Sequence, residues 1–128
     1  MQTYKYDLED RLIKFAVMIL NLSENLPKGY GARSIAKQIV RSGTAPALNY
    51  GEAQSAESPK DFLHKMRVCL KELRETQICL KIINQKPYMD NTLIAPVLDE
   101  CNQLVAIFTT SVETKERNLK KGDRGEKK

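Results

Sequence analysis

Apolar residues recur every three or four positions in four long runs of this chain, and short segments that contain proline separate the runs. The first run has spacings of 4, 3, 4, 3 and 4, and comprises Leu8, Leu12, Phe15, Ile19, Leu22 and Leu26. Such spacing places apolar side chains on one face of an α-helix, and that face must be buried against a neighbour. The chain is therefore constrained to fold as helices packed lengthwise on one another.

Breaks between the runs predict where the helices begin and end. Pro27, Gly29 and Gly31 separate a first helix over about 7–25 from a second over about 32–53. Ser58 and Pro59 fit the N-cap and first position of a third helix, with Asp61 as the acid of a capping box.

Pro87 ends the third helix. The start of the fourth is left open, because Pro96 suits a first turn whereas Asp90, Asn91 and Thr92 are all candidate caps. Four amphipathic helices with short connections predict an all-α, antiparallel up-down four-helix bundle with long helices. Pro46 lies inside the second helix and cannot donate a backbone hydrogen bond, so we expect a kink near residues 42–46.

The middle of the first helix, Phe15 to Leu20, is apolar on every side. One partner face inside the bundle cannot cover such a segment, and the surplus is typical of a subunit interface. The same segment is far too short to span a bilayer, and the N-terminus has no apolar signal region.

The net charge of +5 is concentrated near the C-terminus. Residues 115–128 contain seven Lys or Arg and three Asp or Glu, so only a small excess remains on the rest of the chain. We predict a bundle over residues 1–118 and a basic, disordered tail over 119–128, because the tail has Leu119 as its one apolar side chain.

Enzyme chemistry finds little support in these residues. Cys69, Cys79 and Cys101 are widely spaced on apolar helix positions and are predicted to be buried thiols in a reducing cytoplasm. The one histidine, His64, lies among basic residues and is predicted to be on the surface, so no base or metal set is complete. The segment Gly29 to Gly31 is a lone GxG and is predicted to cap a helix. We therefore expect no catalytic activity, no metal and no cofactor.

Two rows of basic residues indicate a possible nucleic-acid surface. One belongs to the second helix and the loop before it, and the other follows spacings of 4, 3, 4 and 3 on the third helix. The candidate binding residues are Lys28, Arg33, Lys37, Arg41, Lys60, His64, Arg67, Lys71 and Arg74. The alternative is that these rows are ordinary solvent-exposed helix faces, which are also charged. Neither row has the interleaved aromatic residues that are typical of single-strand binding.

Asn49, Tyr50 and Glu52 form a polar group after Pro46. They are predicted to satisfy backbone groups that the proline frees or to cap a subunit contact, with a ligand site as the alternative.

Several motifs in a fixed order resemble one bacterial family, the four-helix-bundle proteins encoded in intervening sequences within 23S ribosomal RNA genes. The matching elements are RSGT at 41–44, NYxEA at 49–53, DFxHKM from Asp61, LKExxET at 70–76 and ECNxLVAIF at 100–108. The chain also departs from the family pattern. At Gly51 the family pattern looks like Arg, and near Ile78 and Cys79 it has a pair of aromatic residues. The family's kink-forming residue falls at Ala47 rather than Pro46.

The resemblance implies a cytoplasmic four-helix bundle, usually a homopentamer, with no established catalytic activity and no catalytic residues to carry over. A similar bundle is the accessory protein of diversity-generating retroelements, where a basic pentamer is thought to engage RNA and reverse transcriptase. We therefore expect a non-enzymatic oligomeric protein with RNA as the first partner and a protein partner as the alternative; an enzyme is a third hypothesis.

Overall fold

The structure, a computed structural model that describes residues 4–126, consists of four long helices. They are α1 (Tyr4–Ser23), α2 (Tyr30–Gln54), α3 (Pro59–Gln85) and α4 (Asn91–Glu126). Each helix packs on the next one along the chain, and α1 closes the bundle against α4. The predicted all-α four-helix bundle is confirmed, and no strand occurs within residues 4–126.

The predicted apolar seams form the core. From α1 they include Leu12, Phe15 and Ile19, and all three side chains are almost completely buried. From α3 and α4 they include Leu73 and Phe108, which have no exposed surface. The periodicity predicted these buried faces, because each seam presents one face of its helix to the centre of the bundle.

The helix starts follow local chemistry that the sequence showed. Ser58 Oγ accepts a hydrogen bond from the Asp61 backbone N–H at 3.1 Å, and Pro59 is the first residue of α3. Asp90 resolves the choice of cap for α4, because its carboxylate accepts the Thr92 backbone N–H at 2.8 Å. Gly29 is the N-cap of α2 with a φ of 135°, a value that L side chains rarely adopt, so the GxG segment is confirmed as a helix cap.

Two boundaries differ from the sequence prediction. α2 begins at Tyr30 rather than near Ala32, which places Tyr30 on the helix. α4 continues without a break past residue 118 and stays helical to Glu126, so the described part of the predicted disordered tail is helix. Leu119 contacts the core and extends the apolar side of α4, although α4 projects beyond the other helices at this end. Residues 127–128 lie outside the described part of the chain.

α2 runs through Pro46 as one helix, and the kink near this residue stays a prediction. Pro46 is fully buried, and the Cys69 thiol of α3 lies 3.5 Å from its carbonyl oxygen. Three residues earlier, Gly43 allows α1 to approach α2 closely. A Cβ added at Gly43 would lie 2.7 Å from two side-chain carbons of Ile19, well inside van der Waals contact.

We predict that Gly43→Ala destabilises the protein by about 1–3 kcal/mol, because the new methyl group overpacks the α1–α2 contact. Gly51→Ala on the same helix is the matched control: an added Cβ there meets no atom within 4 Å. Removing a helical glycine at such a site is expected to stabilise by about 0.5–1 kcal/mol. Urea denaturation measures both. The cost of Gly43→Ala should fall in an Ile19→Ala background, and equal effects of the two glycine substitutions would contradict the close approach.

Candidate nucleic-acid interface

The basic row on α2 consists of exposed side chains. Arg33, Lys37 and Arg41 follow one another at four-residue intervals, so they occupy one side of the helix, and Lys28 precedes them in the loop. Glu52 is the one acidic residue of α2, and it lies near the far end, where its carboxylate accepts a hydrogen bond from Lys65 at 2.7 Å. Most of the length of α2 therefore presents positive charge without a neighbouring acid on the same helix.

Arg41 differs from the other members of this row. Its guanidinium donates hydrogen bonds to both oxygens of Glu72, at 3.0 and 3.2 Å, and to Glu75 at 2.8 Å. These two carboxylates, Glu72 first, raise the pKa of Arg41 above its usual value. The Glu72 side chain is only 11% exposed, so its charge depends on Arg41. The structure gives Arg41 a structural role that the sequence did not separate from the binding row.

The basic row on α3 is also exposed. Lys60, His64, Lys71 and Arg74 have no carboxylate of the described residues within ion-pair distance, and His64 is confirmed as a surface residue. Arg67 forms an ion pair with Glu116 of α4. This row therefore includes one partly neutralised member, as the α2 row does.

The ion pairs of the two rows join them to different neighbouring helices. The paired member of the α2 row, Arg41, reaches toward α3, whereas the paired member of the α3 row, Arg67, reaches toward α4. Acidic residues Glu72 and Glu75 lie along the α2–α3 seam between them. The unpaired cations of the α2 row are Lys28 in the loop and Arg33 and Lys37 on the helix; together they are here called the α2 basic face.

The residues after Pro46 do not share a site. Asn49 donates to the Ala45 carbonyl at 3.0 Å, and Glu52 pairs with Lys65. Tyr50 is buried, with its ring edge-on to Phe108 at a centroid distance of 6.1 Å. The pKa of its phenol is raised, and burial is the main cause. Each of the three side chains is therefore engaged separately, by packing or by a bond of its own, and their predicted role stays a prediction.

The sequence prediction missed one aromatic residue of this surface. Tyr30 is 84% exposed and lies at the start of α2, three residues before Arg33 and seven before Lys37. Residues at i, i+3 and i+7 share a helix face. The spacing of Tyr30 from Arg33 and Lys37 contains this signal, but a helix start near Ala32 leaves Tyr30 in a loop, where the spacing fixes no direction.

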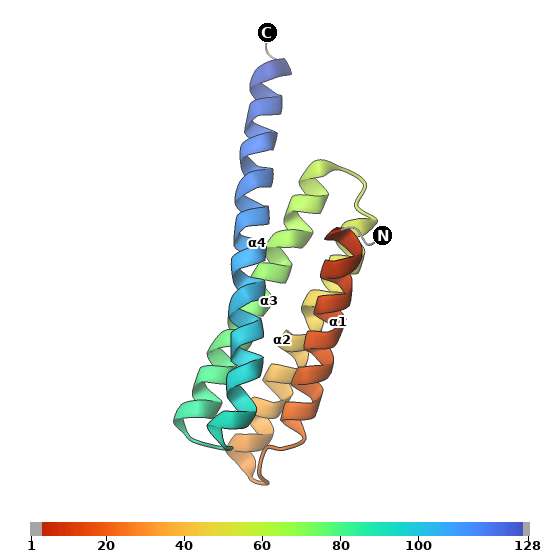
Figure 1. Cartoon of the computed structure of the whole chain (residues 1–128). Helices are drawn as coiled ribbons and strands as arrows, with labels where there is room; N and C mark the ends of the chain where they lie inside the picture. The colour runs from red at the N-terminus through yellow and green to blue at the C-terminus, as the bar shows by residue number, and fades with distance from the viewer. Residues whose placement is uncertain (1–3, 127–128) are drawn as a thin grey trace.

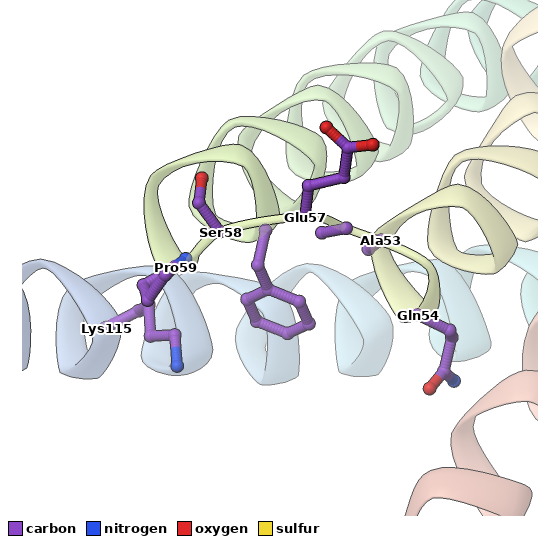
Figure 2. Close-up of a pocket in the computed structure, with 8 residues that line it drawn as sticks. Ala53, Gln54, Glu57, Ser58, Pro59 and Lys115 are labelled. Carbon is purple, nitrogen blue, oxygen red and sulfur yellow. The ribbon is translucent and has the colours of Figure 1, made fainter.

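An open pocket lies at the turn between α2 and α3, against α4 (Figure 2). The Lys115 ammonium lies 5.0 Å from the centre of the Phe62 ring, and the Ser58 hydroxyl is occupied as the cap of α3. The Gln54 amide nitrogen is buried and has no hydrogen-bond partner among the described residues.

The three cysteines are buried, as predicted, and none is paired in a disulfide. Burial raises the pKa of Cys69 and of Cys101 to about 12, so both thiols stay protonated at neutral pH. Across residues 4–126 no three His, Cys, Asp or Glu side chains gather where they could hold a metal ion.

No helix within the described residues combines the length and the apolar character that crossing a membrane requires.

The family model of the 23S rRNA-intervening sequence proteins matches residues 5–110, which is most of the chain. This protein belongs to that family. The resemblance that the motifs indicated is therefore confirmed, and the match reaches all four helices, ending within α4 at residue 110.

One solved structure similar to this chain is a protein of unknown function from the S23 ribosomal protein family of Bacteroides thetaiotaomicron. The two sequences are 29% identical, and the alignment covers 81% of this chain and 96% of the other with a TM-score of 0.75. A comparison with curated proteins found no match.

We predict that Arg41→Ala lowers the melting temperature, whereas Arg33→Ala changes stability by less than about 0.5 kcal/mol. The first substitution leaves the Glu72 carboxylate without its main partner, and the second removes a side chain that has no ion pair. Thermal unfolding followed by circular dichroism measures both variants. Equal melting temperatures would show that Arg41 belongs to the free basic surface after all.

Proposed function

We propose that this protein is a non-enzymatic, self-assembling bundle of the cytoplasm that binds RNA through the α2 basic face. The observation that carries the proposal is that Lys28, Arg33 and Lys37 are exposed and have no acidic partner among the described residues. Cations held this way attract phosphate, because binding releases the counterions of the nucleic acid.

Self-assembly strengthens this proposal by repeating the face. Ile13 and Val17 are each 49% exposed and Leu20 is 41% exposed, and together they form an apolar stripe on α1. Val17 and Leu20 of this stripe belong to the segment Phe15 to Leu20, which is too apolar on all sides for one neighbouring helix of the bundle to cover. A closed ring of copies would cover the stripe and place several α2 basic faces around one particle. The family resemblance favours a pentamer.

A protein partner is the second candidate. The same stripe on α1 would suit a helix of another protein, as would the exposed Ile78 and Ile82 of α3. In this case the protein would be a scaffold or an accessory factor, and the basic residues would serve solubility.

The assembly prediction is tested by light scattering after size exclusion. The protein is expected to elute as a closed oligomer, most simply a pentamer, and Val17→Asp is expected to yield a folded species of 14.6 kDa. Asn21→Asp is the matched control, because it adds the same charge to an exposed polar position of α1. A wild-type monomer at micromolar concentration would remove the self-assembly part of the proposal.

The RNA prediction compares two triple variants of equal charge. Replacing Lys28, Arg33 and Lys37 by Glu is expected to weaken binding to structured RNA strongly and to reduce the salt slope by roughly 3, about one for each lost phosphate contact. Replacing Lys60, Lys71 and Arg74 by Glu on α3 is expected to cost much less. Arg41 is kept in both, because its loss is expected to destabilise the α2–α3 seam. Fluorescence anisotropy over a salt series measures the affinities.

Equal losses in the two triple variants would indicate nonspecific attraction to overall charge. A similar loss on Lys120→Gln with Lys121→Gln would assign the contact to the end of α4. If the wild-type protein binds no RNA at low salt, the proposal should be abandoned in favour of the protein partner.

A further inference from the structure

Tyr30 is the most exposed large apolar side chain of the described residues, at 84%. It is nevertheless part of a rigid element, since it is the first residue of a 25-residue helix. The cap residue Gly29 fixes where the helix begins, and its carbonyl accepts the Arg33 backbone N–H at 3.0 Å. The ring is therefore presented to solvent from a defined position.

Cations lie close to this residue along the chain on the α2 basic face. Arg33 and Lys37 share its helix face, and Lys28 lies two residues before it. A flat aromatic side chain among unpaired cations is the combination with which proteins bind single-stranded nucleic acid, because every base has a face that can stack.

The connection between α3 and α4 brings a second aromatic residue to the same end of the bundle (Figure 1). A Cβ added at Gly31 would lie 2.7 Å from the Tyr88 hydroxyl, so Tyr88 packs against the first turn of α2 through the space that Gly31 leaves. The Lys86 ammonium lies 5.8 Å from the centre of the Tyr88 ring. This end of the bundle therefore combines two tyrosines with a fourth cation.

Acidic residues at this end are few. Asp90 is one of them, and its carboxylate is bound by the Thr92 backbone N–H and hydroxyl, at 2.8 and 2.9 Å. Glu24 is the other, and it lies beyond the last turn of α1. The cations at this end are Lys28, Arg33 and Lys86, so the net charge around the two tyrosines is positive.

We propose that this end of the bundle binds unpaired bases of single-stranded RNA, with Tyr30 as the stacking platform and the α2 basic face holding the adjoining phosphates. The inference rests on the proposed RNA function and specifies which form of RNA is bound. Bases inside a duplex are already stacked on each other and cannot cover the Tyr30 ring, so single strands should be preferred.

The test uses the full chain, an oligouridine of roughly 12 nucleotides and a duplex RNA of matched length. Tyr30→Leu is expected to weaken oligouridine binding roughly 5- to 150-fold, the range that one stacked base supplies, and to leave duplex binding unchanged. Tyr30→Phe should retain the wild-type affinity, because stacking needs the ring and not the hydroxyl. Leu48→Ala, at another exposed apolar position of α2, is the matched control and should change neither affinity.

A fluorescent variant gives a second measurement. The chain has no tryptophan, so Tyr30→Trp introduces a single reporter at the proposed platform. Stacking on bases is expected to quench its emission when oligouridine is added, with little change for the duplex.

The outcomes separate this inference from the proposed function. If Tyr30→Leu binds oligouridine as tightly as the wild type while the triple variant of the α2 basic face does not, the stacking site is overturned and the RNA function stands. Equal affinity of the wild type for duplex and single strand, or no quenching of the Trp variant, would also overturn it. Absence of any RNA binding would overturn both.

Discussion

A small polar cluster inside the apolar α2–α3 interface sets how these two helices align. The hydroxyls of Ser42 and Thr76 are buried and lie 2.9 Å apart, and Arg41 binds Glu72 one turn away. Apolar seams alone tolerate sliding by a turn, whereas a buried carboxylate must keep its cation because an unpaired buried charge is costly. This register decides which cations remain available, since it uses Arg41 in the seam and leaves Arg33 and Lys37 on the surface.

The titratable groups of the interior and the exposed faces of the bundle differ in character. Burial keeps Cys69 and Cys101 protonated, and His64 lies exposed with no carboxylate of the described residues in ion-pair distance. By contrast, the exposed faces of α1 and α2 each have a distinct character, apolar on one and basic on the other. In a family whose structural relative has unknown function, these two faces supply the best physical basis for a role.

Differences between prediction and structure arose where local signals were weak. The end of α4 reads as a polar tail because charged residues dominate it, but Leu119 continues the apolar side of the helix and contacts the core. The start of α2 moved by two residues, which turned Tyr30 from a loop residue into part of a helix face. The two basic rows looked alike in sequence. Only the packing of α3 against α2 and α4 showed that Arg41 and Arg67 are engaged by acids far away in the chain.

The sequence by itself determined the four helices, their order and their buried faces, because helix periodicity and capping depend on residues within a few positions of one another. It also determined the family, through motifs in a fixed order. Tertiary structure alone decided that Gly43 lies against Ile19, that Glu72 needs Arg41, and that Tyr88 comes to rest beside Gly31. Those contacts join residues from different helices and loops, and their partners are chosen by the packing of whole elements rather than by any local pattern.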